Sequence, residues 1–147
     1  MGRKTWESIP TRFRPLKDRT NIVISRNPSA ESCSGGILAN SIESALESIP
    51  EGGAEKVFVI GGAQIYREAL QKAQAKRILL TRVLSDFECD TFFPITLGEN
   101  GKGEGWVRRT KEELDAWVGE SVVEGTQVEN GTSYVFEMWE RIEDTTV

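Results

Sequence analysis

Three short clusters in the sequence combine residue types that suit a phosphate. The first is the pair Gly61-Gly62, which lies between an apolar run and the start of a helical pattern. Glycine lets a ligand approach the backbone closely, and the unpaired N–H groups at a helix start favour an anion. The pair lacks the third, spaced glycine of the dinucleotide-binding fingerprint, so a plain tight turn without a ligand is the alternative.

The other two clusters add cations. Ser25-Arg26 follows a predicted strand, at the edge where α/β sheets place ligands and where a planar guanidinium suits a phosphate. Arg3-Lys4-Thr5 opens a helical stretch, where cations are unfavourable unless an anion is bound there. In both places a solvated cation is the alternative. A further basic cluster consists of Arg12, Arg14, Lys17 and Arg19. These residues fit either a solvated loop or a site that binds a carboxylate.

The composition narrows the chemistry. The 147 residues contain no His, which excludes Ser-His-Asp triads, Cys-His pairs and His-based metal sites. Cys33 and Cys89 are too few for a disulfide framework or a zinc site. We therefore expect both to be free thiols, the protein to be cytoplasmic, and no metal to be bound. The net charge of −5 without a basic block disfavours nucleic acid. No apolar run approaches the about 18 residues that span a membrane.

The first half of the chain predicts short elements. Gly2–Ile9 has a helical pattern, and strands are predicted at Thr20–Arg26 and Gly35–Ala39. Ser41 has the position of an N-cap for a helix that continues to Ile49, because apolar residues then recur at helical spacing.

The middle of the chain predicts a strand–helix–strand unit. Lys56–Ile60 is apolar on both faces, which is typical of a central parallel strand. An amphipathic helix is predicted over Ala63–Gln74, and a second strand over Arg77–Leu84. Short links between them predict a right-handed βαβ unit with parallel strands.

The last third has a different pattern. Gly98–Gly105 is predicted to be a loop with four glycines, and Thr110–Glu113 matches a capping box at the start of a short helix. Val122–Val128 and Ser133–Ile142, joined at Asn130-Gly131, predict an antiparallel hairpin on a type I′ turn.

Taken in order, these motifs resemble those of dihydrofolate reductases. The resemblance rests on Gly2–Pro10, Arg14-Pro15-Leu16, Arg19, Asn21–Arg26, Val57–Tyr66, Leu80-Thr81-Arg82, Asp86–Pro94 and Tyr134–Arg141. It implies an α/β fold in which a mixed, mainly parallel sheet is flanked by helices and ends in an antiparallel hairpin. We expect one domain over residues 1–147, incomplete at its N-terminus. The stretch Gly98–Gly119 resembles the longer form of the eukaryotic enzymes.

The same resemblance implies NADPH-dependent reduction of 7,8-dihydrofolate to tetrahydrofolate, a reaction of one-carbon metabolism. It assigns cofactor binding to Arg3, Lys4, Thr5, Ser25, Arg26, Gly61, Gly62, Ala63, Gln64 and Ile65. Within this set, Ser25 and Arg26 resemble the pocket for the adenosine 2′-phosphate, and Gly61-Gly62 resembles the cis glycine pair beneath the cofactor. Substrate binding is assigned to Ser8, Ile9, Pro10, Phe13, Leu16, Arg19, Ile60 and Tyr66.

The family's catalytic carboxylate has no counterpart at a matching position. In the family a strand, a mobile loop and a helix with this acid precede the Gly-Arg-Lys-Thr-Trp motif, which here follows Met1 directly. The acid is therefore expected before Met1, and Thr81 is the residue that resembles its support. We expect impaired turnover for these 147 residues alone, with a catalytically inactive fragment or binding module as the alternative. Another pterin-like substrate is disfavoured because Arg19 resembles the clamp on the folate α-carboxylate. A monomer without nucleic-acid or membrane partners is the default expectation.

Overall fold

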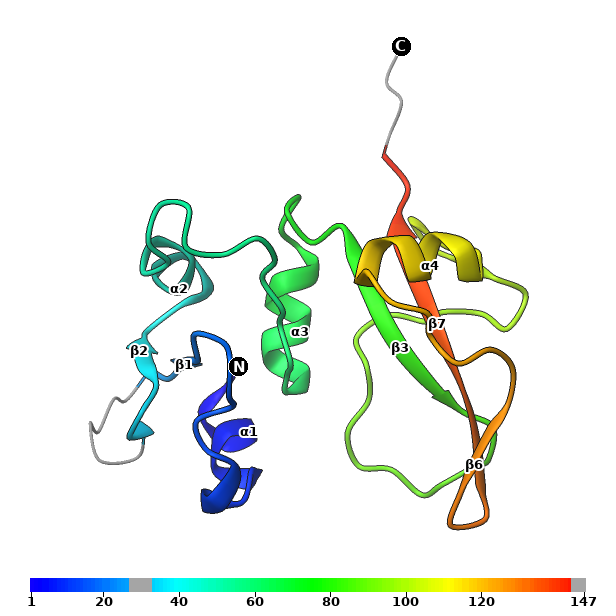
Figure 1. Cartoon of the computed structure of the whole chain (residues 1–147), viewed down its shortest axis with the longest axis horizontal. Coiled ribbons are helices and arrows are strands. Elements are labelled where there is room, and N and C mark those ends of the chain that lie inside the picture. Colours follow the sequence, from blue (N-terminus) through cyan, green and yellow to red (C-terminus); the bar gives the residue numbers. More distant parts are fainter. Residues whose placement is uncertain (27–32, 144–147) are drawn as a thin grey trace. The chain divides into compact units, whose positions relative to one another are not determined.

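The computed structural model describes residues 1–26 and 33–143, which divide into two compact units (Figure 1). The first unit comprises Met1–Lys72, and the second begins at Ala73. The elements of the first unit are α1 (Arg3–Ser8), a 3-10 turn (Thr11–Phe13), β1 (Ile22–Ile24), β2 (Ile37–Ala39), α2 (Ile42–Glu47) and α3 (Ala63–Leu70). Those of the second are β3 (Arg77–Val83), β4 (Lys102–Gly103), β5 (Trp106–Arg108), α4 (Lys111–Val118), β6 (Gln127–Glu129) and β7 (Thr132–Arg141).

The first unit is built on a short parallel pair, β1 and β2, in which Val23 lies opposite Leu38. Trp6 of α1 packs against Val23, and both side chains are almost completely buried. A second apolar cluster joins Ile42 of α2 with Ile65 of α3. The three helices and the parallel pair thus bury part of the apolar positions that the sequence places at helical and strand spacing, whereas Ile37 and Leu46 stay exposed.

The helix predicted from Ser41 is confirmed, although it ends at Glu47 rather than Ile49. The Ser41 hydroxyl accepts a hydrogen bond from the Ser44 backbone N–H at 3.1 Å, and the Ser44 hydroxyl accepts one from Ser41 N–H at 3.1 Å. This reciprocal pair satisfies two N–H groups that the helix itself leaves unpaired.

Lys56–Ile60 does not form the predicted strand: no β-ladder among the described residues includes this segment. A strand needs a hydrogen-bonded neighbour, and an apolar run only indicates that such a neighbour would be favourable. Val57 and Phe58 accordingly are more than half exposed. The predicted βαβ unit is therefore wrong in its first strand, and β3 pairs antiparallel with β7 instead.

The second unit is an antiparallel sheet with β7 at its centre. The strand order is β3-β7-β5-β4, and β6 also pairs with β7. Figure 1 shows β3, β6 and β7 of this sheet. The predicted hairpin is confirmed: Glu129 lies opposite Thr132, and both Asn130 and Gly131 have positive φ, as a type I′ turn requires. With helices and both kinds of strand pairing, the α/β class and the mixed pairing are confirmed. Among the described strands, β1 and β2 pair in parallel and the other pairs are antiparallel.

The predicted capping box of α4 is also present. The Thr110 hydroxyl accepts a hydrogen bond from Glu113 N–H, and the Glu113 carboxylate accepts one from Thr110 N–H at 2.9 Å. Gly119 ends the helix in the left-handed conformation, with φ of 86°. Leu114 is buried, and α4 contacts β7.

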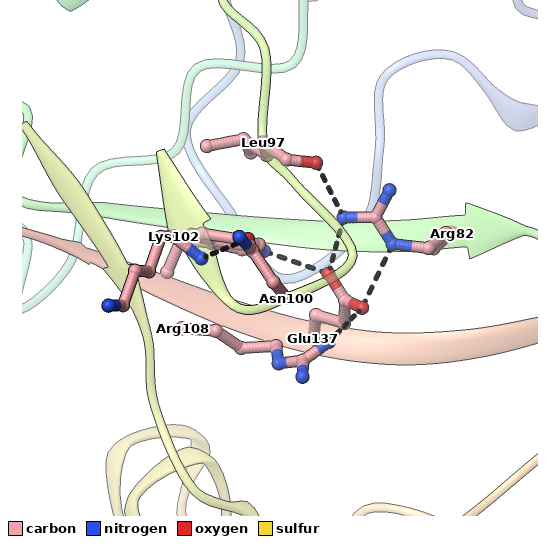
Figure 2. A network of polar contacts seen from close by, with 7 residues as sticks. Arg82, Leu97, Asn100, Lys102, Arg108 and Glu137 are labelled. Carbon is pink, nitrogen blue, oxygen red and sulfur yellow. Dashed lines mark hydrogen bonds and ion pairs between the residues drawn. The ribbon is translucent and has the colours of Figure 1, made fainter. Parts of the chain in front are cut away.

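A buried carboxylate connects three strands of this sheet (Figure 2). Glu137 on β7 accepts hydrogen bonds from Arg82 Nε on β3 at 2.9 Å and from Arg108 Nη1 on β5 at 3.0 Å. The Trp139 indole N–H donates to the same carboxylate at 2.8 Å, and Arg82 Nη2 also donates to the carbonyl of Leu97. Burial raises the pKa of Glu137, but these donors outweigh it and leave the pKa below its ordinary value.

No helix in the described part of the chain is long and apolar enough to cross a membrane.

Candidate functional site

The starts of two helices lie next to each other in the first unit. Gly2 is the N-cap of α1 and Gly62 is the N-cap of α3. The Gly2 N–H donates to the carbonyl of Gly61 at 2.7 Å, and a Cβ on Gly62 would lie 3.5 Å from Thr5 Oγ1. Neither helix has a side-chain cap or an acid in its first turn. Both starts therefore offer backbone N–H groups to the same neighbourhood, which is a favourable arrangement for an anion.

The cluster Ser25-Arg26 reaches the same place through β1. Gly2 forms a parallel bridge with Ile24, and the Ile24 N–H donates to the carbonyl of Met1 at 2.7 Å. Ser25-Arg26 follows Ile24 directly, so it lies at the same end of β1 as Gly2 and Gly61. The three clusters that the sequence singles out, Arg3-Lys4-Thr5, Ser25-Arg26 and Gly61-Gly62, are thus brought together at the C-terminal end of one strand.

The two glycines of the pair have different roles. The peptide bond between Gly61 and Gly62 is cis, as the resemblance implies. Gly61 has φ of +98°, and a Cβ there would lie 3.2 Å from the ring of Tyr66. Gly62 has an extended backbone and only Thr5 Oγ1 near its missing Cβ. Gly61 is therefore required by the fold, whereas the backbone at Gly62 would accept a side chain and leaves space at the start of α3.

The charged side chains at these positions differ in their surroundings. Arg3 forms an ion pair with Glu7 at 3.0 Å on the exposed surface of α1, and Lys4 is exposed. Ser25 is buried and its N–H donates to the Ala39 carbonyl at 2.9 Å, whereas Arg26 is exposed. Two of the cations, Lys4 and Arg26, thus extend into solvent at this end of β1.

The predicted substrate residues follow from the end of α1 into the next loop. The loop is held by Asn21, which is buried. Its side-chain oxygen accepts from the Leu16 N–H at 3.0 Å, and its amide donates to the carbonyls of Leu16 at 2.8 Å and Arg19 at 3.1 Å. The Arg19 Nε donates to the Lys17 carbonyl at 2.9 Å. Backbone and side-chain bonds therefore fix this loop and the position of Arg19.

A cavity of about 310 Å³ adjoins this loop. Its walls are mostly apolar and come from the loop, β1, α2 and the segment 53–60, as expected for a small-molecule site. Of the predicted site residues it brings together Leu16, Arg19, Ile60 and Ile65. It does not include Ser8, Ile9, Pro10, Phe13 or Tyr66.

Other predicted residues lie outside the cavity. Phe13 is 54% exposed, with the Arg12 guanidinium 4.7 Å from the centre of its ring. Tyr66 packs against Gly61, and burial raises the pKa of its hydroxyl. Thr81 belongs to the second unit, where it is exposed on β3 opposite Phe136. No group of three or more potential metal ligands occurs among residues 1–26 and 33–143.

Residues 1–116 match the family model described as dihydrofolate reductase. The chain belongs to the dihydrofolate reductase family. It is 43% identical over 148 residues to a dihydrofolate reductase of Pneumocystis carinii, covering 96% of this chain and 72% of that protein. The dihydrofolate reductase of Candida albicans is 39% identical, with 96% of this chain and 72% of that protein covered.

A solved structure gives the same result for the fold. Schistosoma mansoni dihydrofolate reductase matches with a TM-score of 0.75 and 32% identity, over 96% of this chain and 72% of that one. The family and the fold class that the motif order predicted are therefore confirmed, and relatives from fungi agree with the resemblance to eukaryotic dihydrofolate reductases. The individual roles assigned to site residues stay predictions.

Sequence reasoning did not identify Asn21 as the residue that organises the substrate loop. Its side chain makes three bonds to backbone groups two to five residues earlier. Asn is frequent in such local side-chain-to-backbone bonds, so its position between a polar loop and a strand was the available signal.

Proposed function

We propose that the chain catalyses the NADPH-dependent reduction of 7,8-dihydrofolate to 5,6,7,8-tetrahydrofolate. Membership of the dihydrofolate reductase family supports the reaction class. The observation that carries the proposal in the chain itself is the convergence of Arg3-Lys4-Thr5, Ser25-Arg26 and Gly61-Gly62 at one end of β1. A dinucleotide with several phosphate groups matches a site that combines two helix starts with separate cations.

The residues at this end of β1 fit NADPH. The uncapped start of α3 gives the backbone N–H groups of Ala63, Gln64 and Ile65 to the pyrophosphate, and Gly62 leaves room for it. We assign Ser25 and Arg26 to the 2′-phosphate, since a guanidinium matches phosphate geometry. Lys4 and the other residues at the start of α1 add positive charge and N–H groups. When bound, NADPH supplies the hydride of the reaction.

The substrate is proposed to lie against the loop after α1. Arg19 and Leu16 both line the cavity, and Arg19 is assigned to the α-carboxylate of the substrate tail. Ile60 contributes an apolar wall to the same cavity. The remaining assignments to the substrate are Ser8, Ile9, Pro10, Phe13 and Tyr66.

Thr81 is proposed to support the family's proton-handling carboxylate through its hydroxyl. General acid catalysis contributes about 10²–10⁴-fold to such reactions, so this support matters for turnover. The proposal also places the chain in cytoplasmic one-carbon metabolism, as a monomer without nucleic-acid or membrane partners. No finding favours the alternative of a catalytically inactive fragment.

Equilibrium binding tests this assignment directly. We expect the folded chain to bind NADPH more tightly than NADH, and to bind a dihydrofolate analogue competitively with dihydrofolate. A folded chain that binds neither dinucleotide nor pterin would refute the proposed function. Equal affinity for NADPH and NADH would refute the assignment of Ser25 and Arg26 alone.

A further inference from the structure

The tripeptide Glu-Asn-Gly occurs twice in the second unit, at Glu99–Gly101 and at Glu129–Gly131. In an Asn-Gly pair the glycine nitrogen can attack the side-chain amide of the asparagine, because glycine has no side chain to obstruct the approach. Asn100 and Asn130 are both exposed to water, and the two glycines have nearly the same φ, +78° and +79°. A difference in reactivity between the two sites therefore comes from the hydrogen bonds that the fold makes around them.

The fold engages both reacting groups at Asn100. The Asn100 side-chain oxygen accepts a hydrogen bond from the Lys102 N–H at 3.1 Å (Figure 2). The Gly101 N–H, which belongs to the attacking nitrogen, donates to the Gly98 carbonyl at 3.0 Å. A Cβ added at Gly98 would lie 2.7 Å from the Asn100 oxygen, so this side chain lies closely against the backbone. Attack at Asn100 therefore requires that two hydrogen bonds break first.

The loop that carries Asn100 is also closed and anchored. The Gly98 N–H donates to the Lys102 carbonyl at 3.0 Å, which closes the loop. Just before it, the carbonyl of the buried Leu97 accepts a hydrogen bond from Arg82 at 3.0 Å. The backbone around Asn100 therefore cannot rotate towards the geometry of attack without losing these contacts as well.

Neither reacting group is engaged at Asn130. Among the described residues, no hydrogen bond involves the Asn130 side chain or the Gly131 N–H. Both residues are exposed, and no atom lies within 4 Å of the place where a Cβ on Gly131 would be. The strand before them, β6, has three residues and pairs with β7 alone among the described strands. Short strands with a single neighbour open readily, so the turn can reach the geometry of attack.

We propose that Asn130 is a site of spontaneous deamidation in the folded chain and that the fold protects Asn100. The Gly131 nitrogen attacks Cγ of Asn130 and loses its proton to water. The bond from Cγ to the amide nitrogen then breaks, and ammonia leaves. Water opens the resulting succinimide ring at one of its two carbonyl groups. One product is an ordinary aspartate, and the other is an isoaspartate, in which the main chain continues through Cβ and Cγ.

The two products have different consequences for the hairpin. Asp-Gly suits a type I′ turn as Asn-Gly does, so the aspartyl product keeps β6 paired and adds a carboxylate beside Glu129. Isoaspartate adds one carbon to the backbone of a two-residue turn. The register that places Glu129 opposite Thr132 then no longer fits the turn. Isoaspartate formation therefore releases β6 from β7.

The test follows deamidation of the full, native chain during incubation at mildly alkaline pH. Cleavage after lysine and arginine places the two asparagines in different tryptic peptides, 83–102 and 112–141, each with a single asparagine. Mass spectrometry then measures the conversion of amide to acid in each peptide. We expect Asn130 to react at least about tenfold faster than Asn100, because two hydrogen bonds must break at Asn100 alone.

The same incubation in urea is the matched control. Unfolding removes the hydrogen bonds around Asn100, and the two tripeptides are identical, so the ratio of the two rates should fall to about one. A ratio near one in the native chain would overturn the inference, and so would a tenfold ratio that persists in urea. A native chain in which Asn130 stays intact while both sites react in urea would show that the turn blocks attack, which also overturns it.

The variant Asn130→Asp separates the effect of charge from the effect of the altered backbone. It carries the charge of the deamidated chain on a normal backbone, so hydrogen exchange over Gln127–Glu129 should match that of the unmodified chain. The isoaspartyl fraction, separated chromatographically from aged protein, should exchange faster over the same strand. Equal exchange in this fraction and in Asn130→Asp would overturn the release of β6.

Discussion

Replacing Glu137 with Gln should destabilise the second unit far more than the same change at another acid of β7. The carboxylate accepts four hydrogen bonds: its Oε1 from Arg82 and Arg108, and its Oε2 from Arg82 and Trp139. A glutamine keeps one acceptor oxygen and turns an NH₂ group towards two donors. Two charge-assisted bonds are therefore lost, whichever way the amide is oriented.

The expected loss of stability depends on how far the arginine partners of Glu137 are buried. A hydrogen bond to a charged group contributes about 1.5–3 kcal/mol. The side chains of Arg82 and Arg108 are 19% and 38% exposed, so both can recover part of this by turning to water. We therefore expect a loss of about 2–4 kcal/mol in the free energy of unfolding, measured by urea denaturation at neutral pH.

Glu140→Gln is the matched control on the same strand. Glu140 also has two arginine partners, Arg77 and Arg109, with shortest contacts of 2.6 Å each. Its side chain is 23% exposed and its partners are 34% and 37% exposed, so water weakens both pairs, and we expect a cost of about 1 kcal/mol. Equal losses of stability in the two variants would show that burial of the Glu137 carboxylate does not make its hydrogen bonds more stabilising than those of Glu140.

The lowered pKa of Glu137 also predicts how the stability of the chain depends on pH. Because the folded state lowers the pKa of Glu137, its contribution to stability is complete above the unfolded pKa, about 4.5, and is lost as the pH falls through the lower folded value. The unmodified chain should therefore lose stability below about pH 4.5, and Glu137→Gln should lose less over the same range. Parallel pH curves for the two proteins would contradict this.

The other predictions concern the proposed ligand sites. Arg26→Ala should weaken NADPH binding by at least about tenfold while leaving NADH nearly unchanged, because a charge-assisted bond to the 2′-phosphate is lost; equal losses for both dinucleotides would exclude the assignment. Arg19→Lys should raise the Michaelis constant for dihydrofolate about tenfold, but not that for a pterin without a glutamyl tail, since Lys cannot form the bidentate pair. Gly61→Ala should reduce thermal stability, because φ of +98° and the Tyr66 ring 3.2 Å away both oppose a methyl group. Gly62→Ala should fold normally but bind NADPH more weakly; a larger stability loss at Gly62 than at Gly61 would contradict the different roles of the two glycines.

The features predicted correctly from sequence are mostly local. The N-cap at Ser41, the capping box at Thr110 and the type I′ turn at Asn130-Gly131 depend on residues within a few positions of each other. Such short-range chemistry is readable without knowledge of the fold. The order of motifs then sufficed to predict the family, which the comparisons confirm.

The features that sequence did not predict depend on distant partners. Lys56–Ile60 has the composition of a central strand, but strand formation requires a neighbour that composition does not specify. The Glu137 network joins residues 29 and 55 positions away along the chain, and its charged members have no pattern that distinguishes them from surface residues. The three clusters Arg3-Lys4-Thr5, Ser25-Arg26 and Gly61-Gly62 are likewise brought together by the bridge between Gly2 and Ile24 and by the hydrogen bond from Gly2 to Gly61, which join distant parts of the chain.

The most direct test of the central claim is an NADPH-oxidation assay with dihydrofolate, using protein purified free of host reductase. It should be run on the 147-residue chain with NADPH and with NADH, each with and without dihydrofolate. The account predicts that the chain oxidises NADPH when dihydrofolate is present, not when it is omitted, and more slowly with NADH. A folded chain that binds NADPH and dihydrofolate but leaves both unchanged would contradict the proposed reaction.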